Sequence, residues 1–241
     1  MEERYNRNIL IEGFGKAGQA KLKTSKVLVI GAGGLGSPAL FYLTAAGVGT
    51  VGIADDDVVD TTNLQRQILY ATRDVGRQKT DSASDKLVAL NPDTNLVPYN
   101  CRFTEENAEL IINEYDFVID CCDNYATKLL INDVCVKMKK PYSHGAVVSM
   151  NAEVMTYIPG SACYRCVFET MSADGIPTTS EQSGVLGSVA GIVGSIQATE
   201  AIKYLTGMNG LIINRILIVD AKTMSFFSLK VKKRKSCICE N

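Results

Sequence analysis

The chain has 241 residues, with 25 lysines and arginines against 26 aspartates and glutamates, so its formal net charge at pH 7 is −1. This balance excludes a global attraction to nucleic acid or to an anionic membrane surface, and no apolar run approaches the roughly 20 residues of a membrane-spanning helix. The length suffices for one large α/β domain, and the start Met1-Glu2-Glu3-Arg4 lacks the apolar stretch of a signal peptide, so we expect a cytoplasmic protein.

The first predicted unit is a strand at 27–31, a glycine-rich turn at 31–36 and a helix at 37–47. The turn reads G-x-G-x-x-G, which between a strand and a helix is typical of nucleotide-binding sheets. Glycines let the backbone approach a phosphate, and the helix N-terminus offers free N–H groups. NAD, FAD, S-adenosylmethionine and ATP all use such a turn, and a tight turn without a ligand is the alternative. The candidate nucleotide-binding glycines are Gly31, Gly33, Gly34 and Gly36.

A second strand at 50–54 ends in three acidic residues. Asp55 lies 19 residues beyond Gly36, where the ribose of a nucleotide needs a hydrogen-bond acceptor. Asp57 is a further candidate for the nucleotide site. The alternative for it is a solvated turn residue.

Amides and cations follow this strand at the edge where open α/β sheets bind ligands. Arg66 offers a planar fork of donors that suits phosphate, and Lys79 begins the next predicted helix, at 77–90. A single cation is usually a solvated surface charge, but several behind a phosphate-type turn favour binding. The candidate nucleotide-binding residues of this segment are Asn63, Arg66, Gln67 and Lys79.

The alternation continues with a strand at 94–99, a helix at 105–113, a strand at 116–120 and a helix at 124–138. The last strand runs into Cys121-Cys122-Asp123-Asn124, so Asp123 stands at the mouth of the expected crevice. An enzyme that uses ATP needs a carboxylate there for Mg²⁺, whereas a hydride-transferring enzyme does not. Asn124 is either a ligand or the N-cap of the following helix.

The pattern changes near residue 141. Strands are expected at 152–157, 215–220 and 225–230, a loop at 169–185, and a helix rich in small residues at 187–205. The sequence therefore predicts a doubly wound, mostly parallel, Rossmann-like sheet with an antiparallel C-terminal extension. We expect one domain over 1–241, with a nucleotide-binding half at about 1–140.

Eight cysteines are many for a chain expected in the cytoplasm, where disulfides are rare. Cys163 and Cys166 have the C-x-x-C spacing of a zinc knuckle, and Cys237 and Cys239 form a tighter C-x-C pair. These pairs favour a structural Cys₄ zinc site over redox-active or incidental thiols. His144 is the only histidine. Its surroundings at 141–145 look like a strand end, and we expect a hydrogen-bonded structural imidazole.

In this order, these motifs resemble the ThiF/MoeB/HesA family over nearly the whole chain. The opening Arg4-Tyr5-Asn6-Arg7-Asn8-Ile9 also resembles the start of that family. The resemblance implies an E1-like enzyme that uses ATP to adenylate the C-terminal glycine of a small ubiquitin-like sulfur carrier ending in Gly-Gly. It implies that the half at about 141–241 binds the carrier and zinc and holds the crossover loop. A separate sulfur donor then acts on the product, in a thiamin, molybdopterin or related pathway.

The resemblance also implies roles for single residues. Arg66 and Lys79 contact phosphates, Asp123 binds Mg²⁺, and Arg7 reaches the active site of the partner in a homodimer. The candidate catalytic residues are therefore Arg7, Arg66, Lys79 and Asp123. The two cysteine pairs together bind zinc.

Two features depart from the family pattern. The C-x-C pair replaces a second C-x-x-C, and the crossover loop at 175–184 holds no cysteine. We therefore expect the enzyme to stop at the acyl-adenylate. Two other functions remain open from the sequence. An NAD(P)-dependent oxidoreductase explains the glycines and Asp55 but leaves Asp123 and the cysteine pairs unused, and a non-catalytic nucleotide-binding scaffold is the other.

Overall fold

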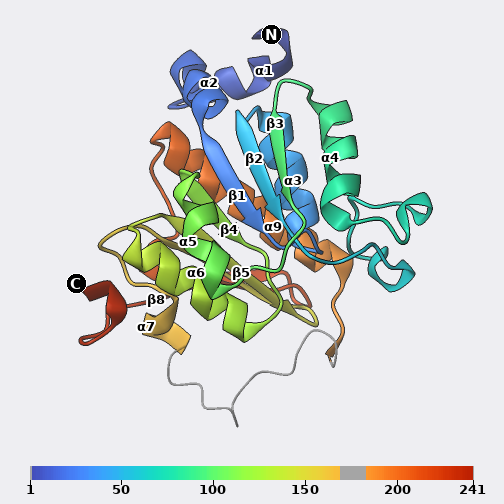
Figure 1. The fold of residues 1–241 in the computed structure, drawn as a ribbon. Coiled ribbons are helices and arrows are strands. Elements are labelled where there is room, and N and C mark those ends of the chain that lie inside the picture. Colours follow the sequence, from blue (N-terminus) through green and yellow to red (C-terminus); the bar gives the residue numbers. More distant parts are fainter. Residues whose placement is uncertain (1, 169–182, 241) are drawn as a thin grey trace.

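The computed structural model describes residues 2–168 and 183–240. The strands are β1 Lys26–Ile30, β2 Thr50–Ala54, β3 Asn95–Tyr99, β4 Phe117–Asp120, β5 Tyr142–Val148, β6 Asn151–Tyr157, β7 Arg215–Asp220 and β8 Ser225–Lys230. They form one sheet in the order β3-β2-β1-β4-β5-β6-β7-β8 (Figure 1). The first five are parallel, and β6, β7 and β8 extend the sheet antiparallel. The predicted fold class is confirmed.

The α-helices are α1 Glu2–Ile9, α2 Gly15–Thr24, α3 Gly36–Ala46, α4 Lys79–Leu90, α5 Glu105–Asn113, α6 Tyr125–Lys137, α7 Tyr164–Phe168 and α9 Gly187–Thr206. Short 3₁₀ turns are η1 Thr61–Asn63, η2 Thr72–Asp74 and η4 Ile238–Glu240. Most boundaries agree with the predicted ranges to within two residues. The loop expected at 169–185 lies outside the described residues, except for 183–185.

Three helices were not predicted, and strand β5 was predicted only as a strand end. Helix α1 is mostly charged and exposed, and it buries mainly Tyr5, so it lacks an apolar period. Helices α2 and α7 are the others, and α7 is only five residues long. We expected 141–145 to be a strand end, but β5 runs through Ser143, His144 and Gly145 as a fully buried part of the sheet. Tertiary contacts of these polar and small residues, described below, override their low strand propensity.

The two faces of the sheet are covered by different helices. Val27 and Val29 of β1 point into a cluster with α2, α3, α4 and α9, whereas Leu28 and Ile30 point into a cluster with α5 and α6. This alternation follows from the two-residue period of a strand. Both faces are covered, which explains why the central strands read as continuous apolar runs.

The register of the sheet brings three chain segments to one edge. Ile30 at the end of β1 pairs with Ala54 of β2 and with Asp120 of β4. The residues that follow these strands, beginning at Gly31, Asp55 and Cys121, therefore meet at the same carboxyl edge. Helices α1 and α2 lie at the opposite end, beyond the start of β1 (Figure 1).

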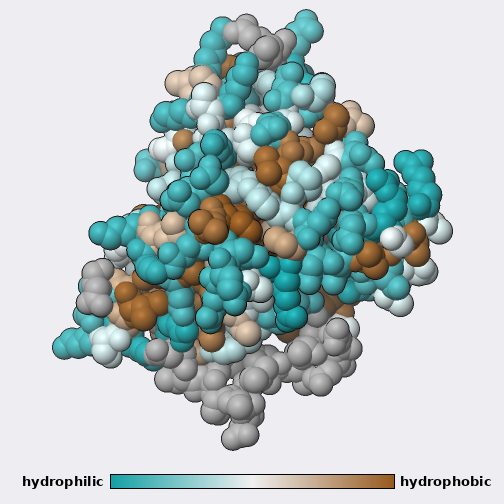
Figure 2. All heavy atoms as spheres, viewed as in Figure 1, coloured by the Kyte–Doolittle hydropathy of each residue, from teal (hydrophilic) through white to brown (hydrophobic). Residues whose placement is uncertain are grey.

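The surface in Figure 2 is mostly hydrophilic, with scattered apolar groups. Strand β8 forms the edge of the sheet, and all six of its residues are exposed, Phe226, Phe227 and Leu229 among them. In the described part of the chain, no helix has the length and apolar character required to span a membrane.

Candidate active site

The glycine turn between β1 and α3 divides into two pairs of glycines. Gly31 has φ +93°, and a Cβ there would lie 2.7 Å from the carbonyl oxygen of Cys121. A Cβ on Gly36 would overlap the carbonyl oxygen of Gly31, so these two glycines let the turn close tightly against the end of β4. Gly33 and Gly34 instead lie beside the side chains of Gln67 and Arg66. The second pair therefore forms the side of the turn that faces the polar segment.

Asp55 holds the glycine turn from the neighbouring strand. Its carboxylate accepts the Ala32 N–H at 2.7 Å and the Asp57 N–H at 3.0 Å. Burial raises the pKa of Asp55, although the nearby Lys79 ammonium and these amide donors act in the opposite direction. A carboxylate offers about four acceptor positions, so two bonds to the backbone leave capacity for a ribose hydroxyl.

Lys79 is buried beside the same acids. Its Nζ lies 2.7 Å from Oδ2 of Asp57 and 3.7 Å from Oδ1 of Asp55. Only 5% of the lysine side chain is exposed, whereas 68% of the Asp57 side chain is exposed. The ammonium therefore lies at the carboxyl edge of the sheet, beside the predicted nucleotide-binding residues Asp55 and Asp57.

The segment after η1 places Arg66 and Gln67 against the turn. The Arg66 guanidinium donates to the Thr62 carbonyl at 3.1 Å, and its stem lies 3.5 Å from the Cβ position of Gly34. Gln67 is 4% exposed, and its Oε1 is buried without a partner among the described residues. A buried acceptor without a partner is costly, so this amide fits a site that a polar ligand completes. Asn63 accepts the Gln67 N–H with its carbonyl and shapes the same turn.

Asp123 lies on the turn between β4 and α6 and is exposed. Within the described residues, its carboxylate makes no hydrogen bond or ion pair. The neighbouring Asn124 caps α6, because its side-chain oxygen accepts the Thr127 N–H at 2.9 Å. The turn carrying Asp123 is thus fixed to the helix while the carboxylate itself stays available.

A buried polar network supports this turn, and the sequence analysis did not anticipate it. Asp120 accepts from Lys128 Nζ at 3.1 Å and contacts His144 Nδ1 at 2.8 Å, and all three side chains are buried. Burial alone would raise the pKa of Asp120, but Lys128 and His144 outweigh it, and the pKa lies below its usual value. Asp120 also accepts the Cys122 N–H at 3.0 Å. His144 is therefore a structural imidazole, as expected.

Helix α9 closes the back of the site. Gln197 donates to the carbonyls of Asp120 and Ser143, at 2.7 and 3.1 Å. A Cβ on Gly187 would lie 2.5 Å from the Gln65 carbonyl oxygen, so the helix begins in close contact with the Arg66 segment. Gly187 and Gly194 of this helix thus pack against other elements of the same chain. The only sequence signal for Lys128 and Gln197 was a polar residue on the apolar face of a helix.

Arg7 does not join these residues within one chain. It is exposed on α1, whose Tyr5 hydroxyl accepts from the Asn91 side chain at 2.7 Å and lies against Gly47. Asn91 and Gly47 end α4 and α3, at the edge of the sheet opposite the glycine turn. Any contact of Arg7 with the nucleotide site therefore requires a second chain.

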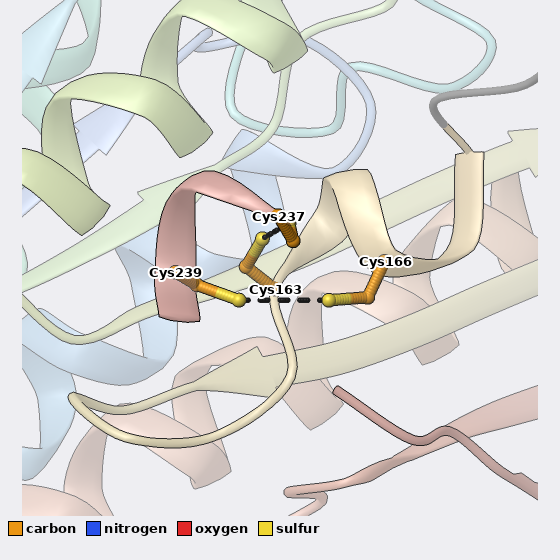
Figure 3. Close-up of side chains that lie close together, drawn as sticks. All are labelled: Cys163, Cys166, Cys237 and Cys239. Atoms are coloured by element: carbon orange, nitrogen blue, oxygen red, sulfur yellow. Dashed lines mark hydrogen bonds between the residues drawn. The ribbon is translucent and has the colours of Figure 1, made fainter. Parts of the chain in front are cut away.

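The four paired cysteines gather below α6, although 73 and 74 residues separate the partners that touch (Figure 3). The Sγ atoms of Cys163 and Cys237 are 3.5 Å apart, as are those of Cys166 and Cys239. All four sulfurs lie within 4.8 Å of one another. Four sulfurs at about 2.3 Å from a tetrahedral zinc lie roughly 3.8 Å apart, so the cluster fits that ion. The shorter C-x-C spacing presents both sulfurs because η4 turns the chain at Ile238.

Comparison with known proteins gives consistent matches. The sequence profile of the ThiF family matches residues 5–241. The chain is 42% identical over 234 residues to "Adenylyltransferase and sulfurtransferase MOCS3" of Culex quinquefasciatus, covering 97% of this chain but only 53% of that protein. It is 40% identical over 235 residues to "SAMP-activating enzyme E1" of Haloferax volcanii, covering 98% of this chain and 87% of that protein.

Solved structures show the same fold. A crystal structure of E. coli MccB with ATP superposes with a TM-score of 0.86, covering 97% of this chain and 73% of MccB at 24% identity. Another, titled "E. coli MccB + MccA-N7isoASN", gives a TM-score of 0.88 and covers 100% of this chain and 75% of the other at 23% identity.

Proposed function

This chain belongs to the ThiF family, and from that premise we propose that it adenylates the C-terminal glycine carboxylate of a small ubiquitin-like sulfur carrier. The observation that carries the proposal is the gathering of phosphate-type groups at one edge of the sheet. Gly33 and Gly34, the second pair of glycines in the turn, lie against Arg66 and Gln67. Gly31 packs on Cys121, two residues before the available carboxylate of Asp123.

The relatives support the same reaction class. The relative from Culex quinquefasciatus, a mosquito, is named an adenylyltransferase and sulfurtransferase, and the relative from Haloferax volcanii is named a SAMP-activating enzyme E1. The chain spans about half the length of the mosquito relative, so sulfur transfer need not reside in it. We propose that a separate donor supplies the sulfur. An NAD(P)-dependent oxidoreductase or a non-catalytic scaffold finds no support among these relatives, and the oxidoreductase also leaves Asp123 without a role.

The reaction requires positioning more than acid–base chemistry. The carrier carboxylate is already ionised and attacks the α-phosphate of ATP, expelling pyrophosphate and forming a mixed anhydride. Catalysis therefore consists of alignment and stabilisation of phosphate charge. We assign the phosphates to the glycine turn, Arg66 and Lys79, and the ribose to Asp55. The amides of Asn63 and Gln67, together with Asp57 and Asn124, complete the proposed nucleotide site.

Magnesium fits the donor set at the turn after β4. Asp123 would hold the ion, because an exposed carboxylate without a protein partner is the oxygen ligand that Mg²⁺ prefers. The ion would supply charge neutralisation at the phosphates. Asp120, Lys128 and Asn124 keep that turn in place.

The second half of the chain, at about 141–241, is the proposed carrier-binding and zinc half of a single domain. We propose that the protein acts as a homodimer, because Arg7 lies at the edge of the sheet opposite its own site. A cytoplasmic location, and no nucleic acid or membrane partner, remain expectations from the composition.

The direct test of the proposed function is ATP–pyrophosphate exchange with and without a carrier ending in Gly-Gly. We expect exchange only in the presence of the carrier, because without it no carboxylate is available to attack. A carrier truncated by its last glycine is the control and should give none. Reduction of a nicotinamide substrate without any exchange would replace the proposal by the oxidoreductase alternative.

The cysteine cluster leads to a prediction about metal content. We expect one zinc per chain, held by Cys163, Cys166, Cys237 and Cys239. Cys163→Ser should lose most of the metal and lower the thermal unfolding temperature, because a structural zinc contributes to the free energy of folding. The measurements are elemental analysis and a melting curve.

Cys101→Ser is the matched control, since that thiol is half-buried and lies outside the cluster. It should keep both the metal and the melting temperature of the unaltered protein. An unaltered protein that is fully stable and free of metal would contradict the zinc site.

A further prediction concerns covalent chemistry. We expect no thiol-linked adduct between carrier and enzyme, because the sequence at 175–184 has no cysteine and four thiols lie in the cluster. Burial raises the pKa of Cys121, Cys122 and Cys135, which suppresses their reactive thiolate form. Non-reducing gels and intact-mass analysis after incubation with carrier and ATP test this. An adduct that thiol removes, and that Cys122→Ser abolishes, would show the prediction to be wrong.

A further inference from the structure

Tyr70 links the polar segment after η1 to the glycine turn. Its hydroxyl donates to the carbonyl of Ala32 at 2.8 Å, in a bond that is buried at both ends. Tyr70 itself is 6% exposed, and its N–H donates to the Gln67 carbonyl at 3.0 Å. One residue therefore contacts the turn through its side chain and the Arg66–Gln67 segment through its backbone.

The bond completes the anchoring of one residue, Ala32, inside the turn. The Ala32 N–H donates to Asp55 at 2.7 Å, and the Ala32 carbonyl accepts from Tyr70. Both backbone groups of this residue are thus held by side chains from two different segments. Anchoring at Ala32 fixes the direction in which the following Gly33 and Gly34 units leave the turn. Removing either hydrogen bond would free the peptide group on that side of Ala32 to rotate.

We propose that Tyr70 is a positioning residue for nucleotide binding, which sets the spacing between the glycine turn and the Arg66 segment. The glycine amides and the guanidinium come from two different segments of the chain and must reach the same phosphates. Tyr70 connects the two segments, because its hydroxyl bonds to the glycine turn and its backbone bonds to Gln67. That the nucleotide is ATP rests on the proposed adenylation. The hydrogen bond from Tyr70 to Ala32 does not depend on that proposal.

The surroundings hold the ring in place and keep the hydroxyl a donor. Lys86 lies with its Nζ 5.5 Å from the ring centroid, and Lys86 in turn pairs with the buried Asp74. Asp74 accepts the Ala71 N–H at 2.7 Å, directly beside Tyr70 in the chain. Burial, followed by the charges of Asp55, Asp57 and Asp74, raises the pKa of Tyr70 well above its usual value. The phenol therefore stays protonated.

The test compares Tyr70→Phe with Tyr142→Phe. Tyr142 is a buried tyrosine whose hydroxyl donates to Asn132 at 2.8 Å, away from the carboxyl edge. Both variants lose one buried hydroxyl and should lose similar thermal stability. Only Tyr70→Phe should raise the Kd of MgATP, by about tenfold, because it leaves a buried carbonyl unpaired at the turn. Binding is measured by calorimetry without carrier.

Hydrogen–deuterium exchange on the ligand-free protein gives a second readout. We expect faster exchange of the amides at 31–36 in Tyr70→Phe and unchanged exchange there in Tyr142→Phe. Lys86→Met, which keeps the hydroxyl but loosens the ring, should give a smaller effect in the same direction. Unchanged exchange at 31–36 and a Kd within twofold in Tyr70→Phe would overturn the inference. Suppose that Tyr70→Phe speeds hydrogen–deuterium exchange at 31–36, but the unaltered protein catalyses no ATP–pyrophosphate exchange. That result would instead count against the proposed function.

Discussion

Replacing Asp123 by alanine is expected to lower the rate of ATP–pyrophosphate exchange by about a hundredfold or more. The carboxylate is exposed at the end of β4 and has no partner among the described residues, and we propose that it holds Mg²⁺ against the phosphates. A metal that neutralises developing charge contributes several kcal/mol of transition-state stabilisation, and about 2.7 kcal/mol corresponds to a hundredfold change in rate. The Asp123 carboxylate makes no hydrogen bond or ion pair within the described residues, so its removal should leave the fold unaffected.

Two further variants make this test specific. Asp123→Asn keeps the size of the side chain but removes its charge, and should recover only a small part of the rate. Asp93→Ala removes another exposed aspartate, which lies between α4 and β3 at the opposite edge, and should keep full activity. The rates are measured at saturating carrier over a range of Mg²⁺ concentrations. Normal exchange by Asp123→Ala would remove this residue from the proposed metal site.

Mixing two inactive variants is expected to restore activity. Arg7→Ala and Asp123→Ala should each be inactive alone. If Arg7 acts in the partner's site, each mixed dimer has one complete site. Random exchange of subunits makes about half of the dimers mixed, and each mixed dimer has one complete site out of two. About a quarter of the normal rate of ATP–pyrophosphate exchange should therefore return. The physical basis is the position of α1, which Tyr5 fastens to Asn91 and Gly47 at the edge opposite the glycine turn.

The control for this experiment is Arg4→Ala. Arg4 lies on the same helix and donates to the Leu90 carbonyl of its own chain at 2.8 Å, so its loss should leave exchange nearly intact. Native mass spectrometry of differently tagged chains confirms that subunits have exchanged. If mixed dimers form and no activity returns, Arg7 does not contribute to the neighbouring site.

Features that depend on local spacing could be predicted from the residues alone. The glycine turn, the strand and the helix flanking it, and the N-cap that was one of the two alternatives for Asn124 were all predictable, because each reflects the backbone needs of a few consecutive residues. The chain order of strand and helix also predicted the parallel sheet, since such alternation has few allowed topologies. From the order of strands it followed that residues after β1, β2 and β4 would meet at one edge.

The contacts that those residues make could not be predicted, because they depend on how distant segments pack together. Tyr70 binds Ala32 across 38 positions and Gln197 binds Asp120 across 77, and no local pattern encodes such pairs. Strand β5 was predicted only as a strand end for the same reason, because the polar His144 is stable in the core only with Asp120 beside it. The C-x-C pair completes the cysteine cluster only because the folded chain returns Cys237 and Cys239 to Cys163 and Cys166. Local chemistry restricts a few dihedral angles at a time, whereas long-range partners are selected by how whole elements pack.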